Sequence, residues 1–477
     1  MEKINKVLLM QPNYSVFGKR IWNMVPYSLG LLNASVKKRF ESDIFDPNFG
    51  NVDDSTIIQT LKDIHPDVVG VSSVSTDYYQ ETEYIVKLIR ETLPYAKIIL
   101  GGVIPTVSLK MAMQDKNVDY WVIGEGDHRF LSLLEELNEG KEVQTEGVAY
   151  YKDGIEKMNH FQKEERLIQD LNSIPFPDYG SLDIIKYGNQ KIKYTAQLIA
   201  KQYPFIVAST SRGCPFNCTF CSGWTVSGKR VRMRSAENVL KEIDELYNKG
   251  FREIIFLDDH FLFDRERAKK IMEGLIERNY DLTWKCVNVN ISNLDDEILE
   301  LMKKSGSYQI TVSIESGNEK VLKEMIKKPF IDLEKAPKIL SKAKEMGFEL
   351  FCNFVIGYPD ETWEQIRETF RYAESLNIDY ADFHIATPLP GTELMKMCMD
   401  KGLINEETQR SGFCLPIIST KEFTSQELRI LRVYEWDRIN FSSYERKKNV
   451  ARMEGITLEE LEQWRKNTRR KLGVKSV

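Results

Sequence analysis

Three cysteines lie within eight residues of one another in the segment TSRGCPFNCTFCSGW, residues 210–224. Cys214, Cys218 and Cys221 are three of the seven cysteines in the chain, and their spacing is C-x-x-x-C-x-x-C. A structural zinc site needs four protein ligands, which three thiols in one loop do not supply. Three thiolates suit three irons of a 4Fe–4S cluster and leave the fourth iron open. The spacing therefore predicts an open-site cluster; the alternative is zinc with a distant Cys or His as fourth ligand.

The composition limits the kind of protein that carries this loop. The chain has 477 residues, 42% hydrophobic and 29% charged, which predicts a soluble globular protein of two to four domains. No apolar run approaches the roughly 18–20 residues of a membrane span, and the first residues lack a secretory signal, so we expect a cytoplasmic protein without a membrane span. A net charge of −5 without long charged blocks gives no indication of nucleic-acid binding. An odd number of cysteines in a reducing compartment favours metal binding or catalysis over disulfides.

Residues 1–145 alternate strand-like apolar runs with amphipathic helical stretches, which is typical of a doubly wound parallel sheet. The predicted strands with their following turns are 6–13, 42–48, 67–76, 96–102 and 119–126. In such a sheet the ligand crevice lies beyond the carboxyl ends of the strands. The residues found there are small or polar and form our first set of site candidates: Ser73, Thr76, Gly101, Gly102, Gly124, Glu125 and Gly126.

A second α/β block follows a linker predicted over 146–203, which holds a short hairpin at 147–158 and closely spaced prolines. Six successive βα-type units over 204–395 predict an open, three-quarter (β/α)6 barrel, with the cysteine loop after its first strand. Ser235 is the predicted N-cap of the first barrel helix, and Gly250 its stop. The charged remainder, 396–477, predicts a small helical C-terminal domain. The fold class is therefore α/β, with a Rossmann-like domain before the barrel.

The cysteine loop, with Phe220 in the aromatic position before its last cysteine, resembles the signature of the radical S-adenosylmethionine (SAM) superfamily. The resemblance implies that the amino and carboxylate groups of SAM chelate the open iron. It also implies that an electron from the cluster splits SAM into methionine and a 5'-deoxyadenosyl radical, which abstracts hydrogen from a substrate. An electron donor such as flavodoxin or ferredoxin is then a partner.

The same resemblance assigns further residues to SAM. Asp258 and Asp259, after the second barrel strand, stand where the family places polar groups for the SAM amine, although the pair could equally cap the following turn. Ser313 and Glu315, two apart on the fourth strand, resemble residues that face the SAM carboxylate and ribose. Gly357 resembles the adenine-side turn. Arg232 and Arg234, just after the cysteine loop, are candidates to meet carboxylates; the alternative is an exposed basic turn.

The segments GVSSVST, IILGGVIPT and WVIGEG, in this order before the barrel, resemble the cobalamin-binding domain of the cobalamin-dependent radical SAM family. The resemblance implies bound cobalamin. One departure is that Val103 and Ile104 stand where relatives commonly carry Pro-His. His65 lies near a sequence that resembles the cobalt-ligating motif of another cobalamin class, but we interpret it as a solvated helix-end residue.

Three functions are compatible with these features. The first is a methyltransferase that acts on an unactivated carbon, or phosphorus, of a small molecule, lipid or peptide and yields 5'-deoxyadenosine and S-adenosylhomocysteine. The second is radical chemistry without methyl transfer, such as cyclisation, rearrangement, oxidation or carbon–carbon coupling, with cobalamin accessory or absent. The third is a non-catalytic metal-binding protein. The motifs leave open the substrate, the oligomeric state and the roles of the other cysteines, Cys286, Cys352, Cys398 and Cys414.

Overall fold

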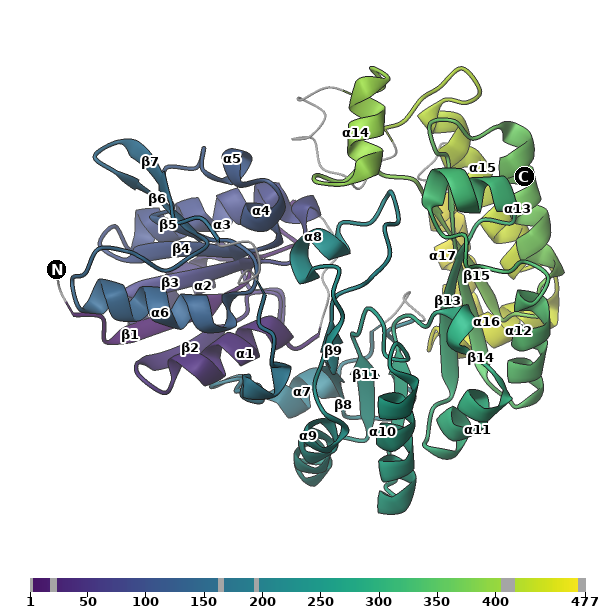
Figure 1. Ribbon diagram of the computed structural model, residues 1–477, viewed down its shortest axis with the longest axis horizontal. Coiled ribbons are helices and arrows are strands. Elements are labelled where there is room, and N and C mark those ends of the chain that lie inside the picture. Colours follow the sequence, from purple (N-terminus) through teal and green to yellow (C-terminus); the bar gives the residue numbers. More distant parts are fainter. Residues whose placement is uncertain (1–2, 18–23, 162–166, 193–196, 405–416, 471–477) are drawn as a thin grey trace. The chain divides into compact units, whose positions relative to one another are not determined.

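The computed structural model describes residues 3–17, 24–161, 167–192, 197–404 and 417–470. These residues pack into two compact units (Figure 1). Unit 1 holds the described residues up to 188 together with 222–233, and unit 2 holds those of 189–221 and from 234 onward. The twelve residues that follow the cysteine loop therefore pack with the first block of the sequence, although they lie within the range predicted for the barrel. Among the described helices, none is both long and apolar enough to cross a bilayer.

Unit 1 is built on a seven-stranded sheet in the order β2-β1-β3-β4-β5-β6-β7. Strands β1 to β5 are parallel, which confirms the predicted doubly wound sheet. The strands are β1 (Lys6–Met10), β2 (Glu41–Phe45), β3 (Val68–Ser73), β4 (Lys97–Gly102), β5 (Tyr120–Val122), β6 (Val148–Lys152) and β7 (Ile155–Met158), with β10 (Arg232–Met233) outside this sheet. The hairpin β6–β7, which the sequence suggests to be part of the linker, extends the sheet because β6 pairs antiparallel with β5.

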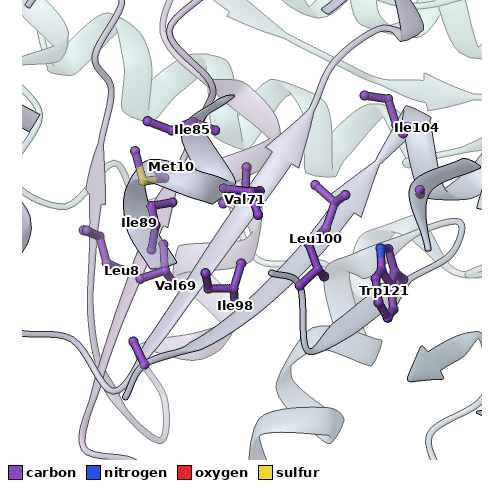
Figure 2. Packing of buried hydrophobic residues seen from close by; sticks show 14 of the residues in the cluster. Leu8, Met10, Val69, Val71, Ile85, Ile89, Ile98, Leu100, Ile104 and Trp121 are labelled. Atoms are coloured by element: carbon purple, nitrogen blue, oxygen red, sulfur yellow. The ribbon is translucent and has the colours of Figure 1, made fainter. Parts of the chain in front are cut away.

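The helices of unit 1 cover both faces of this sheet. They are α1 (Tyr27–Val36), α2 (Asp54–Ile64), α3 (Tyr79–Thr92), α4 (Val103–Val107), α5 (Leu109–Ala112), α6 (Gly126–Asn138), α7 (Ile184–Gly188) and α8 (Gly223–Ser227), with short 3-10 turns η1 (Thr76–Tyr78) and η2 (Leu171–Ser173). Figure 2 shows one face, where Leu8, Val69 and Ile98 pack with Ile85 and Ile89 of α3. Alternate residues, such as Leu9 and Ile99, pack in the core of the other face. Burial on both faces fixes the register and therefore aligns the carboxyl ends of the strands.

Unit 2 contains six strands that follow the predicted βα rhythm: β8 (Phe205–Ala208), β11 (Glu253–Phe256), β12 (Thr283–Cys286), β13 (Gln309–Glu315), β14 (Glu349–Ile356) and β15 (Tyr380–Ile385), with β9 (Ser211–Arg212) in the cysteine loop. They form two parallel three-stranded sheets, β8-β11-β12 and β13-β14-β15. Isolated bridges, Trp284 to Ser307 and Val289 to Val312, join these sheets into one six-stranded arc. The predicted partial barrel is confirmed.

The helices of unit 2 are α9 (Ala236–Asn248), α10 (Arg265–Arg278), α11 (Asp296–Lys304), α12 (Ala336–Glu345), α13 (Trp363–Ser375), α14 (Glu393–Asp400), α15 (Ser425–Asn440), α16 (Tyr444–Met453) and α17 (Leu458–Arg470), with η3 (Ile291–Asn293) and the π-helical turn η4 (Val321–Ile326). Ser235 caps α9 by accepting a hydrogen bond from the Asn238 N–H, as predicted. The helix ends just before Gly250, whose φ of +100° suits a glycine.

Candidate active site

The cysteine loop leaves the carboxyl end of β8 and is fastened to unit 2 on two sides. Cys218 is buried, Cys214 and Cys221 are half-buried, and none forms a disulfide. Between them, Thr219 donates from its N–H to the Ile326 carbonyl at 3.2 Å and from its hydroxyl to the Met325 carbonyl at 2.5 Å. The Thr219 carbonyl accepts a hydrogen bond from the N–H of Leu394 at 2.8 Å. Turn η4 and helix α14 thus hold the middle of the loop.

Asp258 holds the start of the same loop. Its carboxylate, fully buried, accepts hydrogen bonds from the Thr210 N–H (2.9 Å), the Thr210 hydroxyl (2.6 Å) and the Ser211 hydroxyl (2.5 Å). Burial nevertheless raises the pKa of Asp258, because these bonds offset only part of the desolvation. Asp259 is exposed, and its negative charge helps to raise the pKa of Cys214, for which burial is the larger cause. Of the two predicted candidates, Asp259 therefore has the freer carboxylate.

A largely buried lysine that the sequence analysis missed, Lys328, lies near the thiols. The ammonium group of Lys328 donates to a carboxylate oxygen of Glu315 at 2.6 Å, with the two side chains 12% and 5% exposed. Burial alone lowers the pKa of Lys328, but the negative charges of Glu315, Cys218 and Cys221 outweigh it and raise the pKa above its ordinary value. A cation thus stands where thiolates would accumulate negative charge.

Glu315 reaches this lysine because the end of β13 is irregular. The φ of Glu315 is +73°, and the pairing register of β13 with β14 shifts between Ser313 and Glu315. Ser313 donates from its hydroxyl to the side-chain carbonyl of Asn288 at 2.9 Å and accepts from the Asn353 amide at 3.4 Å. Two residues predicted on one strand face therefore have different surroundings: one joins an amide network, the other binds Lys328.

The turn after β14 carries two buried polar atoms with no hydrogen-bond partner in the described part of the chain, the Tyr358 hydroxyl and one oxygen of Glu361. The other Glu361 oxygen accepts from the N–H groups of Gly357 (2.6 Å) and Tyr358 (3.1 Å), which fixes the predicted turn at Gly357. Burial is the main cause of the raised pKa of Tyr358, with smaller effects of Glu315, Glu361, Cys218 and Cys221. The Tyr358 ring lies edge-on to Phe220, with centroids 6.5 Å apart.

In unit 1, hydrogen bonds tie together the carboxyl ends of β3, β4 and β5. The Ser73 hydroxyl donates to the Gly101 carbonyl and accepts from the Ile104 N–H, each at 3.0 Å. The Thr106 hydroxyl, which the sequence analysis missed, donates to the Gly102 carbonyl at 2.6 Å and accepts from the Gly124 N–H at 2.9 Å. Thr76 is buried at the start of η1, and Gly126 begins α6.

The two glycines at this edge have different surroundings. A Cβ built on Gly101 would meet nothing within 4 Å, so its backbone borders open space. A Cβ on Gly102, where φ is +88°, would lie 2.2 Å from the Ser73 carbonyl oxygen.

Glu125, predicted at the same edge, instead pairs with Arg232 in the 222–233 segment. Arg234 pairs with Glu242 in unit 2. Both arginines thus meet carboxylates, one of the two alternatives stated for them.

Comparisons with known proteins identify both units. Residues 208–373 match the family model "Radical SAM superfamily", and residues 23–134 match "B12 binding domain". An uncharacterized methyltransferase of Pyrococcus horikoshii is 31% identical over 437 residues, 90% of this chain and 91% of the relative. The chain belongs to the cobalamin-dependent radical SAM family.

Further relatives of this radical SAM enzyme include a cytidylyl-2-hydroxyethylphosphonate methyltransferase of Streptomyces wedmorensis, 29% identical over 85% of this chain and 84% of the relative. An anaerobic magnesium-protoporphyrin IX monomethyl ester cyclase of Rubrivivax gelatinosus is 25% identical over 89% and 75%. Among solved structures, the cobalamin-dependent SAM radical enzyme OxsB with aqua-cobalamin bound has a TM-score of 0.73 at 17% identity, covering 98% of this chain and 72% of that one. At 17% identity, the likeness to OxsB concerns the fold alone.

The residues of this radical SAM enzyme fit its cofactors. An anionic cluster suits this site, which has three thiols from one loop, a largely buried cation at Lys328 and, in the described part of the chain, an unpartnered Tyr358 hydroxyl. In the described part of the chain no three His, Cys, Asp or Glu side chains converge as a single metal ion requires, whereas each thiolate of a cluster binds a different iron. The open backbone at Gly101 fits close approach by a large flat cofactor. The cofactors are a 4Fe–4S cluster, SAM and cobalamin.

Proposed function

We propose that this cobalamin-dependent radical SAM methyltransferase methylates an unactivated carbon, or phosphorus, of a small molecule, lipid or peptide. The observation that carries the proposal is that one chain combines the three-cysteine loop, with the Lys328–Glu315 pair near it, and a B12-binding domain. When bound, the cluster with SAM would supply radical chemistry for hydrogen abstraction, and cobalamin would supply the methyl group.

The chain's own residues bind and orient these groups. Cys214, Cys218 and Cys221 hold the cluster, and Lys328 offsets the negative charge of the thiolates. Asp259 receives the SAM amine, Ser313 and Glu315 face the SAM carboxylate and ribose, and Gly357 with Tyr358 borders the adenine. Asp258, already engaged with Thr210 and Ser211, positions the loop. At the edge of unit 1, Ser73 and Thr106 shape the backbone that would hold cobalamin. The enzyme works in the cytoplasm with a flavodoxin- or ferredoxin-type electron donor.

The test is anaerobic reconstitution with iron, sulfide and cobalamin, followed by product analysis after reduction with dithionite in the presence of SAM. Methyl transfer yields 5'-deoxyadenosine and S-adenosylhomocysteine in the presence of substrate. Deoxyadenosine without S-adenosylhomocysteine would replace this proposal with non-methylating radical chemistry. Cys218→Ala should abolish cluster iron and SAM cleavage, whereas the matched control Cys352→Ala, in buried β14, should retain both. Intact SAM cleavage in Cys218→Ala would overturn the site assignment.

A further inference from the structure

Phe216, in the cysteine loop between Cys214 and Cys218, contacts two rings from other parts of unit 2. Its ring stacks on that of Phe330, with centroids 4.1 Å apart and planes 24° apart. The His260 ring lies with its centroid 5.1 Å from that of Phe216 and is tilted by 55°. These separations are those of favourable aromatic pairs. We call the rings of Phe330, Phe216 and His260 the ring clamp.

The short turn η3 holds the backbone beside both outer rings of the ring clamp. The Ser292 hydroxyl donates to the Phe330 carbonyl at 2.9 Å. The side-chain amide of the next residue, Asn293, donates to the Leu262 carbonyl at 3.0 Å. Leu262 lies two residues after His260, in the turn that follows β11. Two adjacent residues of η3 therefore fix the segments that present Phe330 and His260 to Phe216.

His260 contributes a flat ring to the ring clamp and no charge. Its side chain is buried, and this burial, with a smaller effect of Lys328, lowers the pKa of His260 to about 4. The imidazole is therefore uncharged at neutral pH. Among the described residues its ring nitrogens form no hydrogen bond. His260 thus acts on Phe216 by packing.

The backbone of Phe216 reaches the first cysteine of the loop. Its N–H donates a hydrogen bond to the sulfur of Cys214. A hydrogen bond to a cluster sulfur stabilises the more negative, reduced form and so raises the reduction potential of the cluster. Because the ring clamp fixes the side chain of Phe216, it also restricts the direction of this N–H.

We propose that His260 and Phe330 are positioning residues that set the reduction potential of the cluster, because they hold the Phe216 ring and so aim its N–H at Cys214. The inference rests on the proposed function, which places the cluster on the three cysteines of this loop. On reduction one electron enters the cluster from an external reductant, and no atom is exchanged. Without the ring clamp the N–H loses its fixed direction, and the reduced form loses stability.

The test is a redox titration of the reconstituted full-length enzyme with titanium(III) citrate, in which titanium(III) gives one electron to the cluster and is oxidised to titanium(IV). In His260→Ala and in Phe330→Ala the equilibrium constant for reduction should fall about tenfold, a shift of about 59 mV to lower potential. His260→Phe restores a flat, uncharged ring and should keep the wild-type potential. The electron paramagnetic resonance signal of the reduced cluster comes only from loaded chains, so incomplete loading does not alter the midpoint.

Phe263→Ala is the matched control. This ring is 44% exposed and contacts His260, with centroids 5.9 Å apart, but it forms no ring pair with Phe216 in the described part of the chain. The variant should keep the wild-type potential. An unchanged potential in both other alanine variants, or an equal fall in Phe263→Ala or in His260→Phe, would overturn the positioning role. A rise in potential would overturn it too, since entry of water has that effect. Absence of a cluster in the reconstituted wild type would instead refute the proposed function.

Discussion

Arg232 binds the carboxylate of Glu125 through two hydrogen bonds of 2.8 Å, one to each oxygen, and the two side chains are only 2% and 6% exposed. The Ile168 N–H donates to the same carboxylate at 2.8 Å, and Arg232 also donates to the carbonyls of Ile168 and Ser227. Because Ser222 directly follows Cys221, this pair fixes the chain that leaves the cysteine loop to the end of β5 in unit 1.

Glu125→Gln should loosen the 222–233 segment. Removing the charge of one partner in a buried ion pair leaves the other charge uncompensated and costs about 3–5 kcal/mol. When the free energy of locally opening the 222–233 segment falls by 3 kcal/mol, the population of the open form rises roughly 100-fold. Limited trypsin digestion reports it directly, since Lys229 and Arg230 in this segment are exposed. Cleavage at these two positions should accelerate in the variant.

A matched control for this digestion is Glu135→Gln, which breaks the exposed pair with Arg39 in the same unit. Exposed pairs contribute about 0–1 kcal/mol, so cleavage at Lys229 and Arg230 should stay at the wild-type rate. If Glu125→Gln were cleaved no faster than this control, the pair would not hold the segment.

Lys328→Met should reduce cluster loading. It removes the cation beside Cys218 and Cys221 and leaves the Glu315 carboxylate buried without its partner, a change that costs about 3–5 kcal/mol. Iron and sulfide per chain after reconstitution should therefore fall, with recovery in Lys328→Arg. The control Lys323→Met removes an exposed lysine from the preceding turn and should load normally. Full loading of Lys328→Met would refute a role for this cation in holding the cluster.

Much of the fold could be predicted because its signals are local. The central strands β1, β3 and β4 of unit 1 carry apolar runs, because both faces of the parallel sheet are buried there. Ser235 and Gly250 mark their helix by short-range hydrogen bonding. The place of the β6–β7 hairpin in the sheet depends on its pairing with β5, a tertiary contact. The packing of 222–233 with unit 1 likewise depends on Arg232 meeting Glu125, which is distant in sequence.

The site shows the same division. The three cysteines could be predicted from the sequence because all come from one loop. Lys328 could not be predicted, because it acquires its role only when η4 and the irregular end of β13 bring it to Glu315. The sequence placed Glu125 at the cofactor crevice for its position after a strand, whereas in the structure both its oxygens bind Arg232. The sequence does not predict the role of Thr106, because a threonine shortly after a double glycine forms no distinctive pattern.

Gly101→Ala should weaken cobalamin binding without harming the fold. The added methyl group meets no protein atom within 4 Å, so the melting temperature of the apoprotein should not change. The methyl group would occupy the space that the cofactor uses, and a roughly tenfold rise in the cobalamin dissociation constant corresponds to about 1.4 kcal/mol. Gly102→Ala is the contrasting variant: its Cβ would collide with the Ser73 carbonyl, so the melting temperature should fall. Wild-type cobalamin affinity in Gly101→Ala would show that the cofactor does not lie on this backbone.

Glu361 should make the stability of unit 2 fall as the pH rises. Burial raises the pKa of Glu361 from 4.5 to about 7, against the opposing hydrogen bonds from Tyr358 and Gly357. Between these two values the folded state binds a proton that the unfolded state has lost, so the free energy of unfolding decreases with pH and levels off above about 7. The shift corresponds to about 3 kcal/mol.

Urea unfolding of the full-length apoprotein between pH 4.5 and 8 tests this dependence against Glu361→Gln. The glutamine keeps an oxygen for the N–H groups of Gly357 and Tyr358 but cannot titrate, so the variant should lack this decrease and gain stability relative to the wild type as the pH rises. Glu364→Gln, an exposed change on α13 close in sequence, should retain the wild-type decrease. A Glu361→Gln profile parallel to the wild type would mean that Glu361 is already ionised in the folded protein at low pH, and that the turn at Gly357 holds a charged carboxylate.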